Sequence, residues 1–194
     1  NQILNLVLGV SPVTVGFVTM LGQLWEAATD AVTGSLSDNT RHRWGRRRPW
    51  ILAGALGCAA VFPFVWRLPA NLSSGGQAAW LTASILVFYT FFSCFTVPYH
   101  AFGYELAPNY HDKTRMMAMR MIFALPAIFA VNLIFPFLQT GWLGAPAQGV
   151  RILAWGFGVV FAATAIWPAL LLREPARPVA AQAAPKVSLA AGMR

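Results

Sequence analysis

The chain alternates long apolar runs with short segments that carry most of its charge. Four runs contain no Asp, Glu, Lys or Arg: residues 50–66, 78–104, 121–150 and 152–172. A fifth run, about 12–37, is interrupted only by Glu26 and Asp30. Each run approaches or exceeds the ~20 residues with which a helix crosses the hydrocarbon core of a bilayer. The pattern predicts five transmembrane helices, with an exposed turn near 140–150, where glycine and proline gather.

Composition supports an all-α membrane protein. Hydrophobic residues make up 57% of the 194 residues, charged residues only 10%, and the mean hydropathy is +0.57. The net charge of +8 does not indicate a nucleic-acid partner, because the cations lie between apolar runs and not along one basic stripe. Cys58 and Cys94 each lie inside an apolar run, as small buried hydrophobes do. No metal-ligand spacing, nucleophile motif or phosphate loop indicates an enzyme.

Most basic residues fall in three segments that alternate with the apolar runs. Residues 38–49, residues 107–120 and the tail from 173 onwards hold twelve of the 14 Lys and Arg, whereas Arg67 and Arg151 lie in the other loops. Lys and Arg accumulate in the loops that remain in the cytoplasm. We therefore expect these three segments to be cytoplasmic and the protein to reside in the cytoplasmic (inner) membrane.

The two ends of the chain indicate a piece of a larger protein. Residues 1–11 are too short to span a bilayer yet too apolar for a free tail, so we interpret them as the end of a truncated first helix with an external loop. Residues 12–173 would hold the transmembrane helices. Residues 174–194, with prolines followed by VAAQAAP, predict a flexible cytoplasmic linker.

A polar face crosses the first predicted helix. Gln23, Glu26, Asp30, Thr33 and Ser37 follow a 3-4-3-4 spacing, which places them on one side of an α-helix. One acid at the centre of a membrane helix costs ~2.5–3.5 kcal/mol on insertion scales, so two acids in one turn need a compensating interaction. A proton, a metal cation or a basic residue from elsewhere would supply it, and a structural contact that joins helices is the alternative. Neighbouring carboxylates also resist double ionisation, which suits a site that binds and releases a cation.

Two motifs carry a family resemblance. They are LWEAATDAVTGSLSDNTRHRWGRRRPWIL at 24–52 and VPYHAFGYELAPNYHDKTRMMAMR at 97–120. They resemble the helix 2–3 and helix 4–5 segments of the glycoside–pentoside–hexuronide:cation symporters of the major facilitator superfamily, to which the melibiose permease belongs. The resemblance implies helices two to six of a six-helix N-terminal half. The first helix would then be nearly absent and the C-terminal half missing.

The resemblance implies a cation site on the first predicted helix. Glu26 and Asp30 match the family's two cation-coordinating acids, Thr29 matches a neighbour that influences the choice of ion, and Ser93 matches a hydroxyl ligand. The coupling ion would be H⁺ or Na⁺, and no other cofactor is implied. Thr96 replaces an acid that borders the site in the melibiose permease, which favours H⁺ slightly.

Four residues are candidates for contact with the solute: Gln23, Thr96, His100 and Arg120. His100 stands where the melibiose permease stacks a Trp on its sugar, and Arg120 aligns with an Arg near that sugar. A satisfied structural histidine is the alternative for His100. For Arg120 the alternative is an anchor at the cytoplasmic interface.

The stretch GSLSDNTRHRWGRR resembles an extended form of the superfamily's loop motif, in which an acid and arginines hold one access state. The resemblance implies a gating loop made of Gly34, Asp38, Arg41, Gly45, Arg46 and Arg47. The two glycines would allow close packing and a turn around Asp38.

Together these features predict a secondary transporter and not an enzyme. The resemblance implies cation-coupled symport of a sugar or glycoside by alternating access. Its partners would be a small-molecule solute, the lipid bilayer and the missing parts of the same protein. A carrier of a lipid or amphipathic organic acid is one alternative, and a non-transport membrane assembly protein is another.

Overall fold

The computed structural model describes residues 4–5, 9–69, 71–107 and 109–171. Within them the chain forms five α-helices, α1 (Pro12–Asn39), α2 (Arg48–Val65), α3 (Ser74–Leu106), α4 (Tyr110–Gln139) and α5 (Pro146–Leu171). The predicted linker 174–194 and most of the predicted terminal segment 1–11 lie outside the described residues. The helices correspond one to one to the five apolar runs of the sequence.

Local signals start most of these helices. Pro12 begins α1, Pro49 is the second residue of α2, and Pro146 begins α5. Proline suits the first turn of a helix because its missing N–H would have had no intrahelical partner there. Ser73 precedes α3, and its side-chain oxygen accepts a hydrogen bond from the Gly76 N–H at 3.3 Å.

The fourth helix differs from the prediction at its start. α4 begins at Tyr110, so most of the predicted loop 107–120 is helical and the connection shrinks to 107–109. Basic residues mark where a helix leaves the membrane, not where the helix ends, because a helix can continue into water. Asp112 in the first turn favours the early start, since an acid interacts well with a helix N-terminus. The turn predicted near 140–150 is present as the short connection between Gln139 and Pro146.

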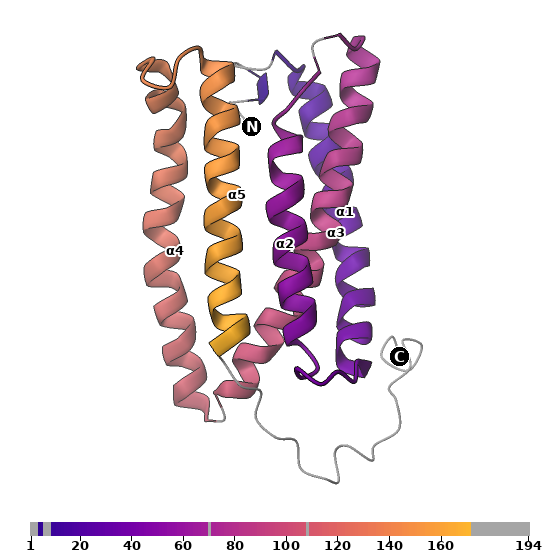
Figure 1. Ribbon diagram of the computed structural model, residues 1–194, viewed down its shortest axis with the longest axis vertical. Coiled ribbons are helices and arrows are strands. Elements are labelled where there is room, and N and C mark those ends of the chain that lie inside the picture. Colours follow the sequence, from indigo (N-terminus) through magenta and orange to yellow (C-terminus); the bar gives the residue numbers. More distant parts are fainter. Residues whose placement is uncertain (1–3, 6–8, 70, 108, 172–194) are drawn as a thin grey trace.

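The helices stand side by side, with connections alternating between the two ends of the bundle (Figure 1). The connections 40–47 and 107–109 lie at one end, and 66–73 and 140–145 lie at the other. This grouping agrees with the alternation of basic residues along the sequence. We call the end that holds 40–47 the arginine-rich end.

Packing is uneven across the bundle. α3 packs extensively against both α1 and α2, and α2 packs against α5, whereas α4 makes few contacts, most of them with α5. Along α4 only Leu138 is buried, and apolar side chains such as Phe123, 76% exposed, cover much of its surface. An apolar surface of this extent suits lipid or further protein helices.

Glycine allows α2 to approach its neighbours closely. A Cβ atom at Gly54 would lie 2.7 Å from the carbonyl carbon of Cys94 and 2.8 Å from the oxygen of Phe91, both in the backbone of α3. A Cβ atom at Gly158 of α5 would lie 2.9 Å from the carbonyl oxygen of Ala59 in α2. Small residues at such crossings let membrane helices associate through backbone contact.

Four of the helices are long and apolar enough to cross a membrane. These spans are Arg48–Val65, Ser74–Leu106, Tyr110–Gln139 and Pro146–Thr164 among the described residues. α1 has 28 residues, enough to cross, but it is less apolar because Glu26, Asp30 and Asp38 all lie on it. Its polar middle is therefore the feature that sets α1 apart from the other helices.

Candidate functional site

The acids Glu26 and Asp30 lie one turn apart near the middle of α1. Both are partly buried, and they interact electrostatically with each other. The Oδ1 atom of Asp30 is buried and has no hydrogen-bond partner among the described residues. A buried carboxylate oxygen without a partner is costly, so this atom is suited to a proton or a bound cation.

A pair of hydroxyl groups connects this turn of α1 to α3. The oxygens of Thr29 and Ser93 lie 2.8 Å apart, and Ser93 is fully buried. The Thr29 oxygen also lies 3.0 Å from each of the carbonyl oxygens of Trp25 and Glu26. On an α-helix, residues 26, 29 and 30 fall within about one third of the circumference, so the two acids and the Thr29 hydroxyl share one face of this turn.

Two further contacts extend this connection along α1 and α3. The indole N–H of Trp25 donates to the hydroxyl oxygen of Thr90 at 2.9 Å, and Thr33 meets the Cys94 sulfur at 3.9 Å. The sequence pattern did not indicate Trp25 or Thr90 as part of the site. Their pairing depends on how α1 and α3 are aligned, which single-helix periodicity does not contain.

The donor atoms gathered here are oxygens. Two carboxylates and two hydroxyls match the hard ligands that Na⁺ accepts, and the unpartnered Asp30 oxygen equally accepts a proton. Within the described residues, no group of three or more His, Cys, Asp and Glu side chains is placed to hold a metal ion. Oxygen donors of this kind suit a proton or a hard cation better than a soft transition metal.

The residues predicted to contact solute are spread over three helices. Gln23 and Arg120 are exposed on α1 and α4, and His100 is partly buried on α3. His100 interacts electrostatically with both Asp30 of α1 and Arg120 of α4. The Thr96 hydroxyl is buried and has no hydrogen-bond partner among the described residues, so it can accept or donate one bond to a ligand.

An ion-pair network closes the arginine-rich end. Arg47 contacts Asp38 at 2.9 Å and Glu105 at 3.3 Å, and Arg46 contacts Glu105 at 2.6 Å and Asp38 at 3.7 Å. We call these four residues the Asp38–Glu105 network. It joins the end of α1, the turn after it and the end of α3.

Glu105 is the member of this network that the sequence analysis missed. It directly follows the charge-free run 78–104 and lies within the second family motif. The alternation of charge placed 38–49 and 107–120 at the same end of the bundle, so an acid at position 105 was in position to meet the arginines. The position of Glu105 and the alternation of charge together could therefore have indicated its contact with the arginines.

The other predicted gating residues have different surroundings. Arg41 is exposed. Gly45 has a φ of +105°, which side-chain-bearing residues rarely adopt, and its N–H donates to the His42 oxygen at 3.0 Å. A Cβ atom at Gly34 would lie 3.6 Å from Val97, an ordinary contact distance. Gly45 is therefore needed for the turn, whereas Gly34 is not needed for close packing.

Comparison with known proteins gives the family. The profile of the family described as "MFS/sugar transport protein" matches residues 3–194. The chain belongs to this family. Membership agrees with the all-helical architecture and with a half-bundle of the major facilitator type.

Several curated proteins that resemble this chain are named symporters. An uncharacterized symporter of Synechocystis is 29% identical over 173 residues, covering 87% of this chain and 32% of the relative. The inner membrane symporter YicJ of Escherichia coli is 26% identical over 118 residues, covering 61% and 25%. Sodium-dependent lysophosphatidylcholine symporter 1-A of Danio rerio is 28% identical over 112 residues, covering 57% and 21%. The chain thus spans about a third or less of the length of these relatives.

Family membership and the apolar helices together identify an integral membrane protein of a transporter family. The relatives are named as symporters and not as enzymes. The family is described by sugar transport, whereas the Danio rerio relative is named for lysophosphatidylcholine.

Proposed function

We propose that this chain forms the N-terminal part of a cation-coupled symporter that moves a sugar or glycoside by alternating access. The observation that carries the proposal is the turn of α1 in which Glu26 and Asp30 share one face with Thr29, whose hydroxyl meets that of Ser93. Asp30 has a buried oxygen without a partner there. An intramembrane acid is expensive, and such acids mark ion and proton pathways.

In this proposal the coupling ion neutralises the acids of α1. Before it binds, two partly buried carboxylates one turn apart repel each other, which disfavours double ionisation. H⁺ satisfies the site by protonating one carboxylate, and Na⁺ satisfies it through the carboxylate and hydroxyl oxygens. The relatives named sodium-dependent support Na⁺, whereas Thr96 in place of a third acid supports H⁺.

The Asp38–Glu105 network serves as the gate of the proposed cycle. It ties the arginine-rich end together in the state described here, and opening that end to the cytoplasm requires these contacts to break. The arginine-rich end is accordingly assigned to the cytoplasmic side of the inner membrane. Gln23, Thr96, His100 and Arg120 would contact the solute between this half and the rest of the transporter.

A second candidate solute is a lipid-like amphipathic molecule. The observation that favours it is the set of relatives named lysophosphatidylcholine symporters. His100 and Thr96 also leave this region without the acid and Trp that the melibiose permease presents to its sugar. Uptake of a panel of labelled sugars and of a labelled lysophospholipid by the whole protein in proteoliposomes distinguishes the two solute classes.

The coupling role is tested by amide substitutions in the whole protein. Asp30→Asn is expected to abolish accumulation of solute against its gradient, while solute counterflow continues because the solute contacts remain. Glu26→Gln is expected to abolish accumulation or to change the preferred ion between H⁺ and Na⁺. Both substitutions keep hydrogen-bonding groups of similar shape, so a purely structural role would leave accumulation within a few-fold of the parent.

Asp112→Asn provides the matched control, because Asp112 is an exposed acid at the start of α4. It should leave both accumulation and counterflow unchanged. Unchanged accumulation in the double variant Glu26→Gln, Asp30→Asn would remove these acids from the coupling mechanism.

A further inference from the structure

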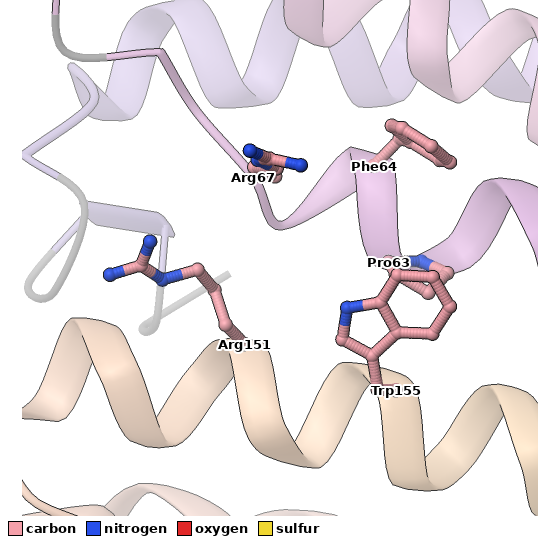
Figure 2. A pocket seen from close by; sticks show the side chains of 5 residues that line it. All are labelled: Pro63, Phe64, Arg67, Arg151 and Trp155. Atoms are coloured by element: carbon pink, nitrogen blue, oxygen red, sulfur yellow. The ribbon is translucent and has the colours of Figure 1, made fainter.

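Two arginines meet at the end of the bundle opposite the arginine-rich end. Arg67 lies in the connection after α2, and Arg151 lies in the second turn of α5. Both line one pocket of about 130 Å³, together with Pro63, Phe64 and Trp155 (Figure 2). These are the two basic residues that depart from the alternation of charge along the chain, and the fold brings them to the same place.

Within the part of the chain that the structure describes, no acid forms an ion pair with the arginines of this pocket. Asp38, Glu105 and Asp112 belong to the opposite end of the bundle. The only acid of the chain outside the described residues is Glu174. Two guanidinium groups that line one pocket repel each other, so an anion bound between them would be stabilised by both.

The chemistry of the pocket selects among anions. Guanidinium groups bind phosphate oxygens through paired hydrogen bonds, which makes arginine the preferred residue for phosphate recognition. Figure 2 shows Arg151 and Trp155 rising from α5 toward the segment of α2 and its connection that carries Phe64 and Arg67. The indole of Trp155 is 58% exposed, and Phe64 is exposed as well. The site thus combines cationic groups with an exposed aromatic surface.

The position of the pocket favours a lipid over a free ion. Pro63 and Phe64 belong to the last turn of a membrane-spanning helix, and Trp155 lies within another span. Tryptophan gathers at the level of the lipid headgroups, where one edge of its ring is apolar and the other is hydrated. A second tryptophan, Trp80, lies at the same end of α2, because its indole N–H donates to the Phe64 backbone oxygen at 3.3 Å. A headgroup phosphate at this depth would meet both arginines, while its glycerol and first methylenes meet Phe64 and Trp155.

We propose that Arg67, Arg151 and Trp155 form a binding site for the phosphate group of an anionic phospholipid. The site lies in the leaflet opposite the arginine-rich end, and it is separate from the α1 acids and from the proposed solute contacts. It does not depend on the identity of the transported solute. Phosphatidylglycerol is the probe that matches this chemistry, with phosphatidylcholine as the lipid of equal chain length and no net charge.

The test measures thermal unfolding of the whole protein in detergent with each lipid added. Phosphatidylglycerol should raise the Tm of the parent more than phosphatidylcholine does, and this difference should be lost in the double variant Arg67→Gln, Arg151→Gln. Arg115→Gln, an exposed arginine on α4 near the opposite end, should retain it. A preference for phosphatidylglycerol in the double variant as large as that in the parent would overturn the proposal, as would stabilisation by inorganic phosphate but not by phosphatidylglycerol.

A second measurement applies if the double variant folds poorly. Brominated lipids quench tryptophan fluorescence on contact, and the Trp155 contribution is the difference between the parent and Trp155→Phe. Brominated phosphatidylglycerol should quench this contribution more strongly than brominated phosphatidylcholine. The single variant Arg151→Gln should reduce that preference. Equal quenching of the Trp155 contribution by both lipids would overturn the proposal.

Discussion

Gly54 is the position at which a single methyl group should disturb the packing of α2 against α3. In Gly54→Ala the new Cβ would lie 2.7 Å from the Cys94 carbonyl carbon, and ordinary contacts start at 3.4 Å, so 0.7 Å is missing. The atoms in the way belong to the α3 backbone, so no side-chain rotation can relieve the clash. Overpacking of this kind costs about 1–3 kcal/mol. The better helix propensity of alanine offsets at most about 1 kcal/mol of that cost.

The expected net effect is a loss of about 0–2 kcal/mol in the free energy of unfolding, the difference between those two quantities, and of about 1–3 kcal/mol relative to a glycine-to-alanine change at an uncrowded helical position. It is measured by equilibrium unfolding of the whole protein in mixed micelles of rising sodium dodecyl sulfate content. Gly156→Ala on α5 is the matched control, because no atom lies within 4 Å of its new Cβ. Gly57→Ala should fall between the two, since its new Cβ meets the ring of Phe91, a side chain that can move. Equal stability of the Gly54→Ala and Gly156→Ala proteins would show that the α2–α3 contact is not as close as described.

Three further predictions concern topology, gating and the α1–α3 contact. A cysteine at His42 should react with a membrane-impermeant thiol reagent only from the cytoplasmic side, and one at Ser74 only from outside; reaction of both from one side would contradict the helix order. Glu105→Gln weakens a partly exposed ion-pair network, so it should shift the equilibrium between access states by about 1 kcal/mol, roughly fivefold, as read from thiol accessibility, while Asp112→Asn should not. Trp25→Phe removes one inter-helix hydrogen bond and should lower the free energy of unfolding by about 0.5–1.5 kcal/mol, and an unchanged value would show that this bond does not hold α1 to α3.

The helices themselves could be predicted because the bilayer imposes a simple rule. A run of apolar residues long enough to cross must be helical, since no water is present to satisfy the backbone. The start of α4 was missed because residues 110–120 carry charges and lie beyond the reach of that rule. Their helical structure depends on local propensity and capping instead.

The site was predictable only where it lies on one helix. Glu26 and Asp30 share a face of α1 because of helix periodicity alone. Ser93 entered through family resemblance, and its contact with Thr29 appears only once α1 and α3 are aligned in space. Trp25 and Glu105 required that same alignment, so no pattern within a single segment could have indicated their partners.

Among the contacts between α1 and α3, the Thr29–Ser93 hydroxyls lie near the middle of α1 and the Asp38–Glu105 network lies at its end. Along α1, Thr29 and Asp38 are nine residues apart, which is about 14 Å at 1.5 Å per residue. Contacts at two points so far apart prevent α1 from rotating about either one, so α1 and α3 move as one unit. While the network is intact, these contacts resist separation of the two helices, so a change of charge at the acids would be accommodated elsewhere in the bundle. The lightly packed α4, and with it Arg120, is the part of this bundle left to yield.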